Sequence, residues 1–282
     1  MSPVSILAIR PHPDDECTGT GAILAYYGKR GERTAVLTCT LGEEGEIHDP
    51  DLDPEEARPR LAEIRERELR DACAVLGVDE VRLLRYRDSG MQGTESNKRP
   101  DAFCNADLDE AGQRVAEVIR ELRPRVVLTE NKNGTYGHPD HVMCHRAAVR
   151  GVELAVASGC AVDRLYSIEL VIEGAQRIAN MLKAENLDPG WFSEEVSPDF
   201  EGLGIKAEDA DAAVDVSEFA PIMRQALSCH RTQIPRDNFL MTWPDRIIKE
   251  VFRTAYFRQL YPAAARVGQV NDLLEALPAV SS

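Results

Sequence analysis

Short apolar runs rich in β-branched residues alternate along this chain with longer segments whose apolar residues recur at helical spacing. The runs predict buried strands at residues 4–9, 33–40, 81–86, 125–129 and 165–172. The segments between them predict helices at residues 20–30, 54–76, 109–122 and 140–158. Strands that alternate with helices are typical of a parallel sheet, because each connection must return to the other end of the sheet.

The chain therefore predicts an α/β fold, a Rossmann-like three-layer αβα arrangement with a mostly parallel sheet and right-handed crossovers. The alternation ends in the last third of the chain, where an acidic stretch at residues 194–215 indicates an irregular C-terminal cap. Helices are expected beyond it at residues 216–229 and 246–256. We expect one domain, with a core at residues 1–175 that carries the functional site and a segment at residues 176–282 that completes the fold and caps the site.

The composition argues against several classes of function. The formal net charge of −15 disfavours nucleic acid as a partner, because binding phosphates needs clustered Lys and Arg. No run of about 18 apolar residues is present in the sequence, so no membrane span is expected. The seven cysteines are scattered without a CxxC pair, and the N-terminus lacks the regions of a signal peptide. We therefore expect a cytoplasmic protein.

Two blocks rich in histidine and carboxylate follow predicted strands. The first, HPDDE at residues 12–16, follows the strand at 4–9, and the second, GHPDH at residues 137–141, follows the strand at 125–129. The C-terminal ends of parallel strands meet at one edge of the sheet, where ligands bind in such folds. Four of the six histidines lie in or next to the blocks, namely His12, His138, His141 and His145. This concentration predicts a metal site assembled from two distant loops.

The spacing of these residues suggests the ligands. His12 and Asp15 are three residues apart on a turn, so an imidazole nitrogen and a carboxylate oxygen could meet one cation. His141 would complete a set of two histidines and one carboxylate, which leaves a coordination position open for water, as in catalytic zinc sites. The alternative for His12 and Asp15 alone is a capped turn, and the second block favours the metal. We expect one Zn²⁺ per chain, although Fe²⁺ or Co²⁺ would suit the same ligands.

The remaining polar residues of the blocks suggest proton transfer. Asp14 could take a proton from a metal-activated water as general base, or it could simply cap the following helix. His138, if protonated, could stabilise an oxyanion or donate a proton to a leaving amine, and Asp140 could hold its ring and raise its pKa. Tyr136 is a further candidate donor to the oxyanion, or a packing residue.

Three motifs together resemble a known enzyme family. They are HPDDE at residues 12–16, TLGEEGE at 40–46 and YGHPDH at 136–141, and they resemble motifs of the zinc-dependent N-acetylglucosaminyl deacetylase family, also called the LmbE or PIG-L-like family. The likeness spans about residues 4 to 150. It implies that the chain removes an acetyl group from an amino sugar.

Within that family the chain resembles most the branch that deacetylates the N-acetylglucosaminyl-inositol precursor of mycothiol, and its sister, the mycothiol-conjugate amidase. RDSGM at residues 87–91 and AFCNAD at 102–107 add to this likeness, and CHRTQ at 229–233 is similar to a C-terminal segment of many members. Two departures are evident. Thr135 stands where many relatives have glycine, and residues 16–21 contain no lysine, which favours the deacetylase over the amidase.

The resemblance implies a role for each matching residue. It implies that His12, Asp15 and His141 bind zinc and that Asp14 is the general base. It also implies that His138 is the acid or oxyanion stabiliser, oriented by Asp140, and that Tyr136 assists at the oxyanion. It also implies that Glu46, Arg65 and Asp88 contact hydroxyl groups of the sugar and inositol. Arg65 could instead lie on a solvated helix face, and Glu46 and Asp88 could be turn residues.

The predicted function is the metal-dependent removal of acetyl from an N-acetylglucosaminyl glycoside or a related N-acyl amino sugar, a small-molecule substrate. The alternatives are a mycothiol-conjugate-type amidase, a metal-dependent phosphoesterase and a non-catalytic sugar-binding protein. A phosphoesterase with two metals would need more bridging carboxylates than these blocks provide. The aglycone and the oligomeric state are left open by the sequence.

Overall fold

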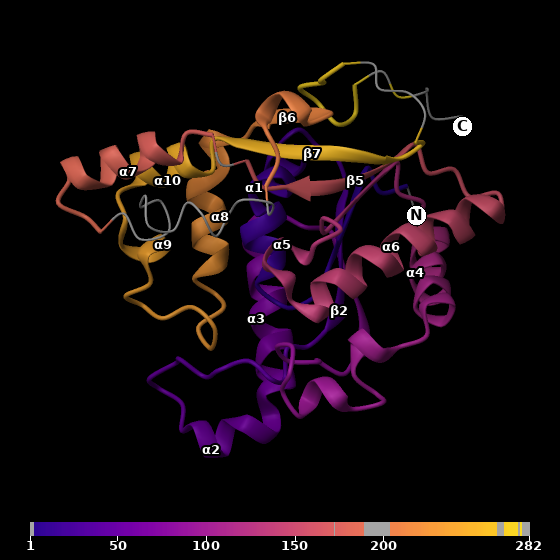
Figure 1. The fold of residues 1–282 in the computed structure, drawn as a ribbon, viewed down its shortest axis with the longest axis horizontal. Helices are drawn as coiled ribbons and strands as arrows, with labels where there is room; N and C mark the ends of the chain where they lie inside the picture. Colours follow the sequence, from indigo (N-terminus) through magenta and orange to yellow (C-terminus); the bar gives the residue numbers. More distant parts are fainter. Residues whose placement is uncertain (1–2, 172, 189–203, 264–267, 276, 278–282) are drawn as a thin grey trace.

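The computed structural model of the chain describes residues 3–171, 173–188, 204–263, 268–275 and 277. Within these residues the centre of the molecule is a seven-stranded sheet with the order β3-β2-β1-β4-β5-β7-β6 (Figure 1). The strands are β1 (Ile6–Arg10), β2 (Thr34–Thr40), β3 (Glu80–Tyr86), β4 (Val126–Thr129), β5 (Arg164–Glu169), β6 (Ala212–Asp215) and β7 (Thr254–Tyr261). The first five run parallel, as the sequence predicts.

The two strands at the β5 side of the sheet differ from the prediction. β7 runs antiparallel to both β5 and β6. The prediction of a helix over residues 246–256 is wrong for its C-terminal residues. The observed helix ends at Val251, and β7 begins at Thr254. Along β7 only Phe257 is fully buried, so the strand lacks a strong apolar run, and β6 has only four residues. Weak local signals of this kind become strands when the edge of a sheet offers hydrogen-bond partners.

Helices cover both faces of the sheet (Figure 1). Alternate residues of β1 show the two layers, because Leu7 and Ile9 belong to the apolar cluster with α4 and α6, whereas Ile6 and Ala8 belong to the cluster with α1 and α3. The helices are α1 (Asp15–Lys29), α2 (Pro54–Ala57), α3 (Leu61–Leu76), α4 (Leu108–Leu122), α5 (Gly134–Gly137), α6 (Pro139–Ala157), α7 (Ala175–Ala184), α8 (Ala220–Leu227), α9 (Phe239–Thr242) and α10 (Asp245–Val251). The three-layer prediction is confirmed.

Local sequence explains where several of these helices begin and end. The single helix predicted over residues 54–76 is divided by a 3₁₀ turn, Arg58–Arg60, between α2 and α3. Pro59 lies in that turn, and a proline cannot donate the hydrogen bond that would continue an α-helix. Gly77 ends α3 with φ 75°, the left-handed conformation that favours glycine after the last turn of a helix.

The C-terminal helices pack on the α1 and α3 side of the sheet, where α8 contacts both helices (Figure 1). Residues 194–203 of the predicted acidic cap lie outside the described residues. Among the described residues, no helix combines the length and the apolar character that crossing a membrane requires.

Candidate active site

The first histidine block forms the turn between β1 and α1. β1 ends at Arg10 and α1 begins at Asp15, so His12 and Asp14 lie in the connecting turn. The N–H of His12 donates to Oδ2 of Asp15 at 3.0 Å, which folds the turn against the start of the helix. Asp14 has φ 111°, a backbone conformation that residues with a side chain rarely adopt. The turn thereby holds the block at the C-terminal edge of the parallel strands.

The second block forms the start of α6. His138 is the N-cap residue, and its Nδ1 accepts a hydrogen bond from the N–H of Asp140 at 3.1 Å. Pro139 occupies the first helical position, where no N–H donor is needed. Because Nδ1 accepts, a neutral His138 carries its proton on Nε2, which is therefore a donor.

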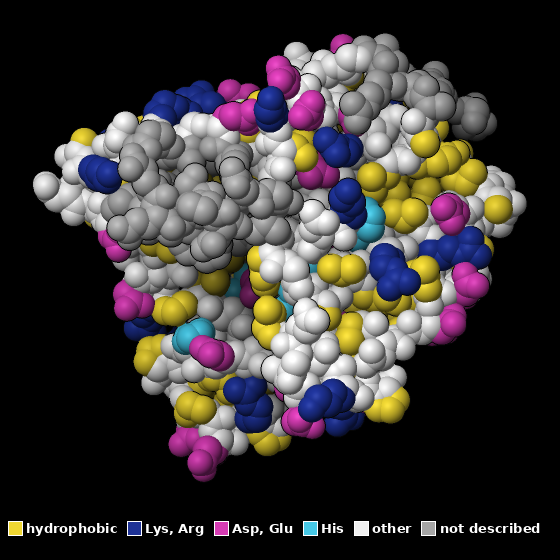
Figure 2. Space-filling view, viewed as in Figure 1, with side chains coloured by type: hydrophobic (Ala, Val, Ile, Leu, Met, Phe, Trp, Pro, Cys, Tyr) yellow, Lys and Arg dark blue, Asp and Glu magenta, His cyan; other side chains and the backbone are white. Residues whose placement is uncertain are grey.

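The structure brings the three predicted metal ligands together. Oδ2 of Asp15 lies 3.3 Å from Nδ1 of His12 and 3.5 Å from Nε2 of His141. All three residues are buried at the edge of the sheet. On the face shown in Figure 2, histidine and acidic side chains are visible at the floor of a central hollow.

Two further residues lie beside the predicted ligands, in two overlapping groups of possible donors. One ring nitrogen each of His12, His138 and His141 lie within 4.8 Å of one another, and so do donor atoms of Asp15, Glu130 and His141. Imidazole and carboxylate are ligands that zinc, iron(II) and cobalt(II) accept. The donor set therefore fits one divalent transition metal, with His138 and Glu130 beside the predicted ligands.

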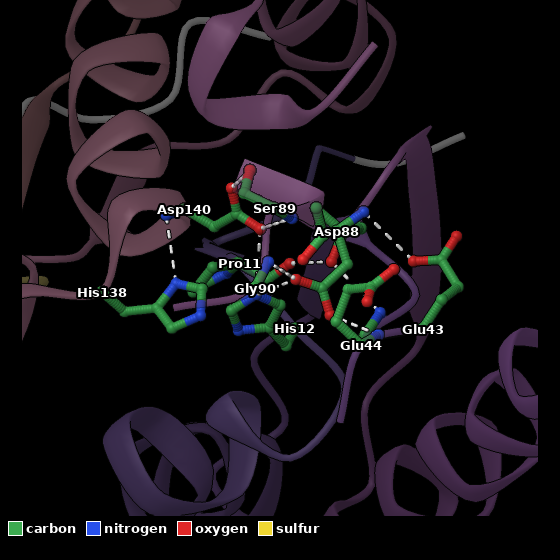
Figure 3. Close-up of polar contacts among 12 residues, drawn as sticks. Pro11, His12, Glu43, Glu44, Asp88, Ser89, Gly90, His138 and Asp140 are labelled. Atoms are coloured by element: carbon green, nitrogen blue, oxygen red, sulfur yellow. Dashed lines mark hydrogen bonds and ion pairs between the residues drawn. The ribbon is translucent and has the colours of Figure 1, made fainter. Parts of the chain in front are cut away.

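The carboxylate of Asp140 contacts a different histidine from the one predicted. Its Oδ2 lies 3.2 Å from Nε2 of His12 and accepts the N–H of Ser89 at 2.9 Å, while its Oδ1 accepts the Ser89 hydroxyl (Figure 3). Only the backbone N–H of Asp140 contacts His138. The reason is geometric. The side chain of the N-cap residue His138 folds back onto α6, so the carboxylate of Asp140, two residues later, faces the turn that carries His12.

Asp88 lies on the same side of His12 as Asp140 does (Figure 3). Its Oδ1 is 3.7 Å from Nε2 of His12 and accepts the N–H of Gly90, while its Oδ2 accepts the N–H of Glu44 at 3.0 Å. The predicted substrate residue is thus buried and also organises two turns.

Arg65 contacts the predicted base. It is buried rather than on a solvated helix face, and its guanidinium lies 3.0 Å from Oδ2 of Asp14. The same guanidinium donates to the carbonyl oxygens of Gly42 and Pro13. Burial raises the pKa of Asp14 to about 6, although the charge of Arg65 acts in the opposite direction.

Two histidines of the cluster, His138 and His12, have opposite pKa shifts. Burial, together with the charges of His12 and His141, lowers the pKa of His138 to about 4. The charge of Asp140 acts in the predicted direction and raises this pKa, but it does not outweigh burial and the charges of His12 and His141. Burial alone would lower the pKa of His12, but Asp140 and Asp15 raise it well above its ordinary value.

Tyr136 lies over the cluster on α5. Its hydroxyl is 3.4 Å from Nε2 of His141, and about half of the residue is exposed to solvent. The preceding residue, Thr135, has φ 60°, a strained conformation for a β-branched side chain. The Thr135 hydroxyl donates to Oε2 of Glu130 at 2.8 Å, and this bond helps to hold the loop.

Glu46 is the predicted site residue that the contacts do not link to the cluster. Its side chain is 84% exposed, and its carboxylate lies 3.2 Å from Nε2 of His48.

The predicted site residues did not include Glu130, whose buried carboxylate lies 2.5 Å from Arg10 and 3.5 Å from Nδ1 of His141. The signal was available, because Glu130 directly follows β4 at the ligand-binding edge.

The fold and the buried histidine–carboxylate cluster define an α/β protein with a candidate metal site, and the chain belongs to the PIG-L family. The family model described as "PIG-L: GlcNAc-PI de-N-acetylase" matches residues 7–152. A 1D-myo-inositol 2-acetamido-2-deoxy-α-D-glucopyranoside deacetylase of Acidothermus cellulolyticus is 38% identical, over 99% of this chain and 97% of that protein.

Solved structures of more distant proteins share the fold. The N,N'-diacetylchitobiose deacetylase of Pyrococcus horikoshii is similar with a TM-score of 0.57 and 20% identity, covering 91% of this chain and 83% of that one. The 4-carboxy-2-hydroxymuconate hydratase of Pseudomonas putida is similar with a TM-score of 0.61 and 16% identity, covering 93% and 98%. A deacetylase and a hydratase thus share this fold, so the fold alone does not decide the reaction.

Proposed function

We propose that this protein is a metal-dependent hydrolase that removes the acetyl group from an N-acetylglucosaminyl glycoside, with the inositol glycoside as the leading substrate. The observation that carries the proposal is the buried contact of Asp15 with both His12 and His141, next to the carboxylate of Asp14. The high identity to a relative named for deacetylating such a glycoside supports the choice of substrate.

Each residue of the cluster would have a defined role. His12, Asp15 and His141 would hold one Zn²⁺, which when bound supplies Lewis-acid polarisation of the amide carbonyl and acidifies water. Asp14 would accept the proton of the attacking water. Nε2–H of His138 would donate to the oxyanion, with the Tyr136 hydroxyl assisting, and Asp140 would orient His12. The products are acetate and a free amine.

Arg65, Asp88 and Glu46 would contact the sugar and inositol hydroxyl groups. Arg65 and Asp88 support this role by position, because they lie beside Asp14 and His12. Glu46 is exposed on the loop after β2 and would reach a substrate from the solvent side.

The proposal is tested by amine release from a panel of N-acetylglucosaminides, among them the inositol glycoside. The metal-free protein is compared with protein loaded with zinc, iron(II) or cobalt(II), and bound metal is counted per chain. We expect amine release that a chelator abolishes and that one equivalent of metal restores. No release from any acetamido sugar with any of these metals would exclude the proposal.

The same assay separates the alternative enzymes. A mycothiol-type thiol conjugate and a phosphate monoester are added to the panel. Faster cleavage of the conjugate would assign the chain to the amidase reaction, and phosphate release with two metals per chain would indicate a phosphoesterase.

A further inference from the structure

The C-terminal segment reaches the start of α1 through an ion pair that is inaccessible to solvent. Nε2 of His230 lies 2.6 Å from Oε1 of Glu16, and both side chains are 0% exposed. Glu16 is the second residue of α1, whereas His230 lies beyond the end of α8. A buried charge is costly unless it is paired, so each of these residues depends on the other.

The second carboxylate oxygen of Glu16 holds the backbone of Asp14. Oε2 of Glu16 accepts the N–H of Asp14 at 2.9 Å, while Oε1 also accepts the thiol of Cys17 at 3.1 Å. The N–H of Asp14 precedes the helix and has no partner within it. Its φ of 111° is unfavourable for a residue with a side chain, and such a conformation persists only where the surroundings impose it.

Contacts therefore hold both the side chain and the backbone of Asp14. Its side chain contacts Arg65 and its backbone contacts Glu16. Burial alone would raise the pKa of Glu16 and lower that of His230, yet their mutual attraction reverses both shifts. The contact with His230 at 2.6 Å holds the carboxylate of Glu16 in the orientation in which its other oxygen accepts the N–H of Asp14.

We propose that His230 and Glu16 are positioning residues for Asp14, so that the C-terminal segment sets the geometry of the catalytic turn. The inference rests on the proposed function, because it assumes that Asp14 is the base. Neither His230 nor Glu16 is assigned a contact with substrate. His230 orients the carboxylate of Glu16, and Glu16 holds the strained backbone from which the Asp14 side chain reaches the reacting water.

The same segment offers a matched control. The hydroxyl of Thr232 donates to Glu68 at 2.6 Å and its N–H donates to the same carboxylate at 2.8 Å, which ties the segment to α3. Both residues are buried. Removing the hydroxyl in Thr232→Val therefore weakens the attachment of the segment without touching Glu16 or Asp14.

The experiment compares His230→Leu, His230→Gln, Glu16→Asp and Thr232→Val as full-length, metal-loaded proteins. Measured are kcat and KM for amine release, bound metal per chain, and hydrogen exchange of peptides that span residues 10–20. We expect His230→Leu and Glu16→Asp to lower kcat by about 10²-fold, the usual scale for a misplaced catalytic group, with metal content and KM little changed. Exchange at residues 10–20 should accelerate in both variants.

His230→Gln should recover much of kcat, since its amide N–H can reach Glu16 from the position of Nε2. Thr232→Val should keep wild-type kcat and exchange at residues 10–20 even if its melting temperature falls. A folded His230→Leu or Glu16→Asp protein with wild-type kcat and exchange would overturn the inference, as would an equal loss of kcat in Thr232→Val. If the wild-type protein releases no amine, the proposed function fails, and the exchange data alone decide whether His230 controls the turn.

Discussion

At the scale of single residues, the turn after β1 combines strain with charge. Asp14 has φ 111° and places its carboxylate beside Asp15, an arrangement that contacts from Arg65 and Glu16 help to stabilise. Strained residues of this kind cluster at functional sites, because selection for activity outweighs the local cost. The strain supports a chemical role for Asp14 in place of simple helix capping, and its side chain makes no capping hydrogen bond.

We expect Asp14→Asn to lower kcat by about 10²- to 10⁴-fold while the protein keeps its metal, because the amide cannot accept a proton. Asparagine tolerates positive φ better than most residues, so the fold should persist. Steady-state kinetics and metal analysis check this. The control is Asp107→Asn at the N-cap of α4, where the side chain accepts the N–H of Glu110, and activity there should be unchanged. Wild-type turnover in Asp14→Asn would exclude it as the base.

At the scale of elements, the position of α6 determines where the second histidine block lies. α6 begins at Pro139, directly after its N-cap His138, and packs closely along α4. A Cβ added to Gly151 would stand 2.4 Å from Cγ1 of Val115, a contact too short for real side chains. The two helices therefore approach closely because a glycine stands at the crossing.

We expect Gly151→Ala to lower the free energy of unfolding by about 1–2 kcal/mol, because overpacking outweighs the gain in helix propensity. Gly28→Ala is the matched control near the end of α1, where a Cβ would meet only Gly77 O at 3.5 Å and Leu76 O at 3.9 Å. That substitution should leave stability equal or raise it by up to about 1 kcal/mol. Urea unfolding followed by circular dichroism measures both, and a neutral Gly151→Ala would contradict the close crossing.

The scale of elements also shows what local patterns can and cannot predict. The central strands β1, β2 and β4 were predictable because they are buried on both faces, and β1 also forms a nearly continuous apolar run. β6 and β7 were missed because they complete the sheet by pairing at its edge, with only Phe257 fully buried along β7. Their hydrogen-bond partners, and not their composition, make them strands.

At the scale of the whole molecule, C-terminal residues return to α1, the helix that follows the turn after β1. The hydroxyl of Tyr27 on α1 donates to Asp272 at 2.7 Å and accepts the N–H of Leu273 at 2.7 Å. Arg30 lies 2.9 Å from the same carboxylate. Burial alone would raise the pKa of Asp272, but the bond from Tyr27 and the charge of Arg30 lower it.

A group whose pKa is lowered on folding stabilises the protein above its unfolded pKa, near 4 for aspartate, and this stabilisation is lost as the pH falls through the folded value. We therefore expect Asp272→Asn to cost about 1 kcal/mol at pH 7. The difference from wild type should stay constant down to about pH 5 and shrink below about pH 4. Urea unfolding across this range checks it.

The control is Asp101→Asn, which removes an exposed carboxylate paired with Arg99 and should leave stability unchanged. An Asp272→Asn difference that grows on acidification would show that the sign of the pKa shift is wrong.

The sequence by itself determined the parallel core and the place of the site. Hydrophobic periodicity is a local property, and strands that run parallel bring their C-terminal ends to one edge, so His12 and His141 could be expected to meet before any contact was known. Only the tertiary structure decided which partner each polar atom takes. Asp140 faces His12, and Glu16 pairs with a histidine 214 positions away, because such contacts depend on how distant layers pack and leave no periodic trace in the chain.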